Sequence, residues 1–160
     1  MKKTKHITNF INAIFNTAYT KEEIIFQIFS FQYQQNPVYR QWCQAFSKTP
    51  HTVTAAIDIP FLPISFFKKY PILSSRSIPQ TIFESSGTTL SIPSKHYVTS
   101  LNIYKQSFMS AFEREYGSIN EWCILGLLPS YLERKNSSLI VMVDEMIHRS
   151  QHSLSGFYLN

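Results

Sequence analysis

The sequence contains little glycine, little cysteine and little charge. Among its 160 residues there are four glycines and two cysteines, and 16% of the residues are charged. Two cysteines without CxxC or Cys/His metal spacing supply neither a disulfide framework nor a zinc site. We therefore predict that Cys43 and Cys123, which both lie among apolar neighbours, are free, buried thiols in a reducing cytoplasm.

Long hydrophobic runs are also absent. No apolar stretch approaches the roughly 20 residues of a membrane span. The basic start of the chain is followed by polar residues at positions 9, 12, 16 and 17, where an export signal would have an uninterrupted apolar core. The sequence therefore predicts a cytoplasmic protein with no membrane span.

Clustered positive charge is lacking as well. The 15 Lys and Arg residues against 10 Asp and Glu give a formal charge of +5 and a pI near 9.2, which would favour anionic ligands such as nucleotides, coenzyme A or nucleic acid. Beyond the first few residues, however, the basic side chains are dispersed. Dispersed charge is typical of a solvated surface, so we predict no nucleic-acid partner.

The chain is instead rich in apolar and aromatic residues. Hydrophobic residues make up 44% of it and aromatic residues 15%, which is too apolar for a disordered segment. Its length is typical of one domain. We predict one globular domain over residues 1–160.

The first part of the chain predicts helices. Apolar residues recur at helical spacing over residues 7–15. Thr20 and Glu23 fit a capping box that begins a second helix, and Asn36-Pro37 supplies the cap and first residue of a third. The predicted inner face of the third helix consists of Tyr39, Trp42, Cys43 and Phe46.

Residues 47–80 contain prolines at positions 50, 60, 63, 71 and 79. These prolines exclude a long helix and a central strand. The apolar residues between them predict an extended strip laid across a core, and the wall of a pocket for an apolar substrate is the alternative.

Strand and helix patterns alternate from residue 81 onward. We predict strands over 81–83, 122–128 and 155–160. We predict helices over 98–116, ended by Gly117, and over 136–147, capped by Asn136. The inward residues of the latter helix would be Leu139, Val141, Met142, Val143, Met146 and Ile147.

This alternation predicts an α/β fold, in which amino-terminal helices are followed by a partly parallel sheet with crossover helices. The last predicted strand has no closing helix, so one face of the sheet would be uncovered. Either another chain covers that face, as in a homo-oligomer, or the sequence is part of a longer one and the domain is incomplete.

One polar segment stands out for its chemistry: Ser85, Ser86, Gly87, Thr88 and Thr89. Successive backbone N–H groups and hydroxyls in such a loop can converge on phosphate oxygens, and Gly87 permits close approach of the backbone. The alternative is an ordinary solvated turn. No Gly-Lys-Ser/Thr follows, so this is not a Walker loop.

The segment resembles the phosphate-binding motif of adenylate-forming enzymes. Further blocks resemble one branch of that superfamily, the acyl-protein synthetase (LuxE) and phenylacetate-CoA ligase-like acyltransferase family, over its amino-terminal portion. These blocks follow in order from about residue 27 to the end, at 59–68 (IPFLPISFFK), 94–96 (SKH), 127–134 (LLPSYLER), 137–139 (SSL) and 155–158 (SGFY).

The resemblance implies an enzyme that activates a fatty or aryl carboxylic acid with ATP as an acyl-adenylate and then transfers the acyl group to a thiol. The acceptor would be coenzyme A or a protein thiol. Ser85, Ser86, Gly87, Thr88 and Thr89 would hold the ATP phosphates. The Mg²⁺ ligand would come from a later part of the family's sequence, which this chain lacks, and no catalytic residue can be assigned.

Other residues are secondary candidates. Ser94 and His96 would contact the nucleotide or the substrate carboxylate, although His96 could equally be structural. A weaker set of candidates on the substrate side lies in the loop after the strand predicted over 122–128, since ligands bind beyond strand ends in open α/β sheets. It consists of Ser130, Tyr131, Glu133 and Arg134, for which a surface ion pair and a packing tyrosine are the alternative. His148 and His152 are interpreted as exposed histidines at a helix end, so we predict no metal site.

Two departures from the family pattern favour a second hypothesis. Leu90 stands where the family's loop has glycine, and a leucine does not readily adopt the backbone geometry that glycine permits. The later acidic motif and the carboxy-terminal lysine-bearing lid domain of the family are absent. The alternative function is therefore a truncated or degenerate, non-catalytic nucleotide-binding fragment of such an enzyme.

Overall fold

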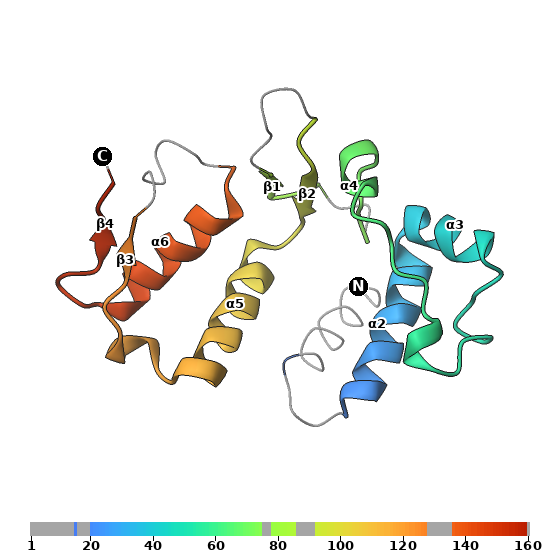
Figure 1. Cartoon of the computed structure of the whole chain (residues 1–160), viewed down its shortest axis with the longest axis horizontal. Coiled ribbons are helices and arrows are strands. Elements are labelled where there is room, and N and C mark those ends of the chain that lie inside the picture. The colour runs from blue at the N-terminus through green and yellow to red at the C-terminus, as the bar shows by residue number, and fades with distance from the viewer. Residues whose placement is uncertain (1–14, 16–19, 75–77, 86–91, 128–135, 160) are drawn as a thin grey trace. The chain divides into compact units, whose positions relative to one another are not determined.

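The fold is described by a computed structural model over residues 15, 20–74, 78–85, 92–127 and 136–159 (Figure 1). The chain divides into two compact units, Met1–Ile78 and Pro79–Asn160. Helices and small sheets together make it an α/β protein, as predicted. None of the helices in the described residues has both the length and the hydropathy that crossing a membrane requires.

Two capped helices organise the first unit, α2 (Lys21–Gln35) and α3 (Pro37–Ala45). The capping box of α2 is confirmed: Glu23 N donates to Thr20 Oγ1 at 3.2 Å, and Thr20 N donates to the Glu23 carboxylate at 2.9 Å. These bonds lower the pKa of Glu23. Asn36 Oδ1 likewise accepts from Tyr39 N at 3.1 Å. The helix predicted over 7–15 lies outside the described residues, apart from residue 15.

The core of this unit forms where α3 crosses α2. Tyr39 and Cys43 are buried as predicted, and Trp42 is half-buried, with its indole N–H donating to Phe61 O at 3.0 Å. Phe46, by contrast, is 53% exposed. Its predicted inward position is wrong because Phe46 lies one residue beyond the helix, as its C-cap. The buried residues of this core are Phe29, Tyr39, Cys43, Val53 and Ile59.

The proline-rich stretch has little regular structure, as its prolines predicted. It contains a 3₁₀ turn, η1 (Ala56–Asp58), and one short helix, α4 (Phe66–Lys69). Val53 and Ile59 are buried in the core and Leu62 packs against it. The strip across a core is therefore confirmed only in part, because Ile57, Phe61 and Ile64 are 90%, 78% and 78% exposed. A pocket wall for an apolar substrate stays a prediction.

The described part of the second unit contains two small sheets and two helices. The strands β1 (Thr81–Glu84) and β2 (Lys95–Val98) pair antiparallel, and β3 (Leu125–Gly126) and β4 (Gly156–Phe157) pair parallel. The helices are α5 (Leu101–Tyr116) and α6 (Ser138–Ser150), and a 3₁₀ turn, η2 (Ile119–Glu121), follows α5. Because α6 connects the two parallel strands, the predicted crossover from β3 to β4 is confirmed (Figure 1). In the described residues, however, β1 pairs with β2 in a separate sheet, so the prediction that the strand at 81–83 joins the same sheet is wrong.

Several element boundaries differ from the predicted ones. Helix α5 begins at Leu101 because Ser100 caps it, and the preceding residues form β2, a strand that the sequence analysis missed. The strand predicted over 122–128 is β3, two residues long. Helix α6 is capped by Ser137, whose hydroxyl accepts from Ile140 N at 3.4 Å, and not by Asn136. Gly117 ends α5 as predicted, with φ at +80°.

Apolar clusters hold these elements together. One consists of Phe83, Val98 and Val141 and joins the β1–β2 hairpin to α6. The other consists of Met109, Ile119 and Met146 and joins α5 to α6. Leu139 is 47% exposed, so its predicted inward position is wrong. It lies in the first turn of α6, where Ile140 and Val141 take the buried face.

Cys123 is exposed, and its predicted burial is wrong, whereas Cys43 is buried. Both thiols are free, as predicted. Ile124, the neighbour of Cys123, packs against the Met109 cluster instead.

The β3–β4 sheet has one packed and one open face. A Cβ placed on Gly126 would lie 2.9 Å from Phe157 Cδ1 and 3.1 Å from Val143 Cγ1, so this position faces α6. Leu125 and Leu127, on either side of it, are 58% and 71% exposed. In the described residues, the face of this sheet away from α6 is thus apolar and exposed.

Gly126→Ala tests this close packing. The added methyl group overpacks the contact with Phe157 and Val143, so we expect a loss of about 1–3 kcal/mol in the free energy of unfolding. The matched control is Gly156→Ala, whose new Cβ would lie 3.6 Å from Tyr158, an ordinary contact distance, and should change stability little. Urea unfolding of both variants measures this. Equal stability of the two would contradict the packing of β3 on α6.

Candidate functional site

The hydroxyl-rich segment connects the two strands of the β1–β2 hairpin. At its base, Ser85 N donates to Ser94 O at 3.0 Å, and Ser94 N donates to Ser85 Oγ at 2.9 Å. These two bonds continue the strand pairing by one step and hold the ends of the segment together. The remaining predicted phosphate-site residues, Ser86, Gly87, Thr88 and Thr89, lie outside the described residues, as does Leu90.

The base of the hairpin leaves donors available from its serines. Ser85 is exposed, and because its oxygen accepts from Ser94 N, its hydroxyl proton is free to be donated to an anion. The backbone N–H and C=O of Ser94 are both used in closing the segment. Ser94 could therefore contact a ligand through its hydroxyl and not through its amide.

Charge at the base of the hairpin is balanced locally. Glu84 and Lys95 stand directly opposite each other in the strand register, and their carboxylate and ammonium groups are 3.4 Å apart. A half-exposed pair such as this adds little stability. It does neutralise a carboxylate that would otherwise repel an anion bound next to Ser85.

His96 lies opposite Phe83 in the register and therefore on the same face as Phe83 and Val98, which are both buried. The residue as a whole is exposed, but its ring is partly desolvated, and this desolvation lowers the pKa of His96. This shift favours the neutral form of the imidazole, which adds no positive charge at the base of the loop.

A contact that the sequence analysis missed joins the two predicted site segments. The weaker, substrate-side candidates Ser130, Tyr131, Glu133 and Arg134 lie outside the described residues. Asn136, two residues beyond this segment, is described, and its carbonyl accepts from Glu84 N at 2.9 Å. The described chain just after one segment is therefore bound to the strand residue just before the other. Because backbone groups form this bond, the residue types in the sequence do not predict it.

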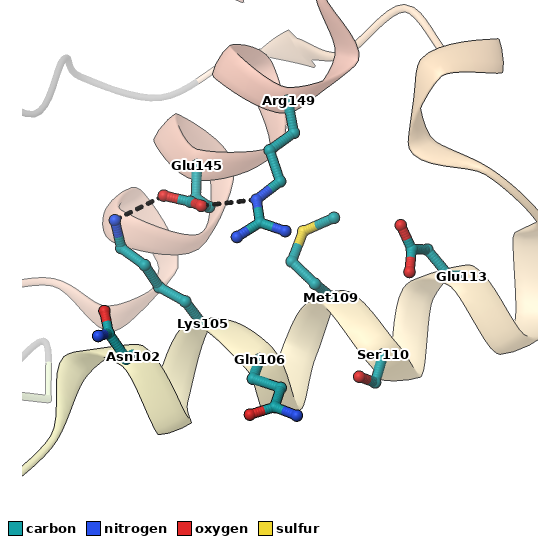
Figure 2. Close-up of a pocket in the computed structure, with 8 residues that line it drawn as sticks. All are labelled: Asn102, Lys105, Gln106, Met109, Ser110, Glu113, Glu145 and Arg149. Carbon is teal, nitrogen blue, oxygen red and sulfur yellow. Dashed lines mark hydrogen bonds and ion pairs between the residues drawn. The ribbon is translucent and has the colours of Figure 1, made fainter. Parts of the chain in front are cut away.

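A pocket of about 330 Å³ lies elsewhere, between α5 and α6 (Figure 2). None of the predicted site residues lines it. Its lining residues are Asn102, Lys105, Gln106, Met109, Ser110, Glu113, Glu145 and Arg149.

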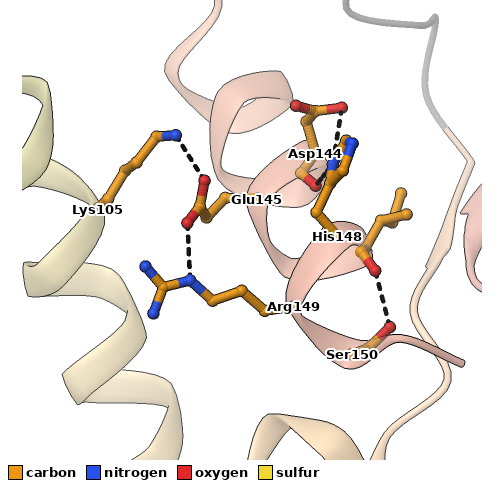
Figure 3. A network of polar contacts seen from close by, with 7 residues as sticks. Lys105, Asp144, Glu145, His148, Arg149 and Ser150 are labelled. Carbon is orange, nitrogen blue, oxygen red and sulfur yellow. Dashed lines mark hydrogen bonds and ion pairs between the residues drawn. The ribbon is translucent and has the colours of Figure 1, made fainter.

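The charges of this pocket are largely paired with one another. The Glu145 carboxylate accepts from Lys105 Nζ on α5 and from Arg149 Nε on α6, the latter at 2.7 Å (Figure 3). Burial alone would raise the pKa of Glu145, but the hydrogen bonds and charges of its two partners lower it. We interpret this cluster as a structural link between the two helices.

The two histidines near the end of α6 are both exposed, as predicted. His148 lies 3.6 Å from the Asp144 carboxylate one turn earlier. His152 Nδ1 accepts from Leu154 N at 3.1 Å, beyond the helix. Among the described residues, no group of three His, Cys, Asp or Glu side chains could hold a metal ion.

Comparison with known protein families gives one match. The model of a family described as "Acyl-protein synthetase, LuxE" matches residues 15–149, which is most of the chain. Comparisons with curated proteins and with solved structures give no match.

Because its ring is partly desolvated, His96 should lose its proton at a lower pH than an ordinary histidine. We expect its ring resonances to titrate below the ordinary histidine pKa of about 6.5. Because the unfolded chain then binds the proton more readily, the stability that neutral His96 contributes is complete above that value and is lost as the pH falls through the folded pKa. NMR titration measures the midpoint, and His96→Gln should remove this part of the pH dependence of unfolding. A midpoint at or above the ordinary value would contradict the desolvation.

Proposed function

The chain belongs to the acyl-protein synthetase (LuxE) family, and from this premise we propose that it activates a carboxylic acid with ATP and passes the acyl group to a thiol. The family match supports an acyl-activating enzyme. The route through an acyl-adenylate, as in the adenylate-forming superfamily, is the finer part of the proposal.

The observation that carries the proposal is the closed base of the hydroxyl-rich segment. Ser85 and Ser94 hold its two ends together by two hydrogen bonds. The sequence between these two serines is rich in hydroxyl and backbone N–H donors, and short loops of this kind bind anions through converging donors. The donor set suits phosphate oxygens, since it consists of neutral hydroxyl and amide groups next to a balanced ion pair.

The proposed reaction has two steps. A carboxylate oxygen attacks the α-phosphorus of ATP, and pyrophosphate leaves with the electron pair of the broken P–O bond. A thiol sulfur then attacks the acyl carbonyl carbon, AMP leaves, and the thiol proton passes to solvent or to a base. Ser86, Thr88 and Thr89 would donate to the phosphates, with the backbone of Gly87 close by, and so stabilise the charge that develops on the leaving group. Mg²⁺ would supply further counter-charge when bound. Coenzyme A or a protein thiol would be the acceptor.

Leu90 supports a second candidate, a nucleotide-binding protein that performs no acyl transfer. The family's loop has glycine at this position, and the bulk and restricted backbone of leucine disfavour the same loop geometry. The two candidates differ in pyrophosphate release in the presence of a carboxylic acid, since only the enzyme produces it.

The hydroxyls of Thr88 and Thr89 test the phosphate site. We expect Thr88→Val and Thr89→Val each to raise the Kd for ATP about tenfold, because a hydrogen bond to a charged phosphate is lost. Pyrophosphate release with a panel of fatty and aryl acids should fall accordingly. The control is Thr99→Val, an exposed threonine just after β2, which should match the unmodified chain. If all three variants bind ATP equally well, the loop is an ordinary turn.

Leu90→Gly separates the two candidate functions. Glycine restores the backbone freedom of the family's loop, so we expect tighter ATP binding, by several-fold, and faster pyrophosphate release with a suitable acid. Isothermal titration and the pyrophosphate assay measure the two effects. If ATP binds but neither the unmodified chain nor Leu90→Gly releases pyrophosphate with any acid, the non-catalytic function holds instead.

A further inference from the structure

Tyr104 connects the β1–β2 hairpin to the start of α6. Its ring packs on Phe83 of β1, with the ring centroids 5.0 Å apart. Its hydroxyl donates to the carbonyl of Ser138, in the first turn of α6, at 2.9 Å. Burial raises the pKa of Tyr104, so the hydroxyl stays protonated and acts as a donor at neutral pH. One side chain of α5 thus contacts both β1 and α6.

A second connection reaches the same place. Glu84 N of β1 donates to Asn136 O at 2.9 Å. Between Asn136 and Ser138 stands Ser137, the cap of α6. The carbonyls on either side of the cap are therefore both bound, one by β1 directly and the other through Tyr104. Two such bonds fix the direction as well as the position of the chain at residues 136–138.

The tyrosine bond is not required to satisfy the helix. A carbonyl oxygen has two lone pairs, and Ser138 O has a helical N–H partner one turn later in addition to the phenol. Removing the phenol hydroxyl leaves no buried group without a partner. The hydroxyl therefore contributes to where α6 begins more than to whether α6 forms.

We propose that Tyr104 is a positioning residue for acyl activation. This inference rests on the proposed function. By holding the start of α6 against β1, Tyr104 fixes residues 136–138, which come shortly after the substrate-side segment, relative to Glu84, which comes directly before the hydroxyl-rich loop. In the first reaction step a carboxylate oxygen has to meet the α-phosphorus at bonding approach, and a small displacement of one partner costs a large part of the rate. Tyr104 limits that displacement without touching either substrate.

The test compares Tyr104→Phe with Tyr116→Phe. Both variants remove one phenol oxygen from α5, but Tyr116 is 59% exposed and its ring contacts Phe112 and Trp122. Because the base of the hydroxyl-rich loop is closed within the hairpin, we expect Tyr104→Phe to leave the Kd for ATP unchanged. We expect it to lower kcat/KM for the carboxylic acid about tenfold, the effect of losing one positioning hydrogen bond. Tyr116→Phe should retain both values.

A merely structural role would reduce ATP affinity and acid activation together and lower the thermal unfolding midpoint, and that result would overturn the proposal. An unchanged kcat/KM for the acid would overturn it as well.

Amide hydrogen exchange tests whether Tyr104 holds the start of α6, and it does not require catalysis. Tyr104→Phe should speed exchange at Glu84 N and Val141 N, the donors to Asn136 O and Ser137 O, relative to the unmodified chain and to Tyr116→Phe. If the unmodified chain releases no pyrophosphate with any acid, the proposed function fails, and exchange alone then decides whether Tyr104 holds the start of α6. Unchanged exchange at both amides means that it does not.

Discussion

The antiparallel register of β1 and β2 is the constraint on which the candidate site depends. Phe83 and Val98 are buried on one face of the hairpin, and Glu84 and Lys95 form their ion pair on the other. A slip of one residue would exchange the two faces, taking Phe83 out of the core and separating Ser85 from Ser94. The apolar core thus enforces the register, and the register closes the base of the hydroxyl-rich segment.

Behind the hairpin, α5 and α6 form the support. Their packing combines the cluster around Met109 and Met146 with a carboxylate, Glu145, that is paired with one cation from each helix. A carboxylate with two partners is neutralised more fully than one in a single surface pair, and its geometry fixes the two helices side by side. Residues that reach from this support toward the hairpin can then hold a loop end in a defined place, as Tyr104 does.

The described residues around the hairpin supply hydrogen-bond donors more than net positive charge. Desolvation lowers the pKa of His96 and so favours its neutral form, and Lys95 is paired with Glu84. A triphosphate bound by such donors would still need a cation to balance its charge. In the proposed reaction this is the part of Mg²⁺, while the loop would supply direction and selectivity for phosphate oxygens.

The sequence by itself determined those features that rest on neighbouring residues. The capping box at Thr20, the cap at Asn36 and the stop at Gly117 are contacts within a few positions along the chain, so the residue types are enough to place them. The strand–helix alternation likewise predicted the parallel crossover from β3 to β4. The resemblance to the family also indicated two segments as the candidate site, and their role stays a prediction.

Only the tertiary structure decided which groups meet across long stretches of chain. Asn136 was a plausible cap, yet Ser137 caps α6 and the Asn136 carbonyl binds Glu84. The strand β2 exists because it pairs with β1, and the exposure of Phe46, Leu139 and Cys123 depends on what the fold places against them. Backbone carbonyls and amides are nearly the same at every residue, so residue types do not predict which of them pair. Burial is a property of the whole packed chain, for which local pattern is an incomplete guide.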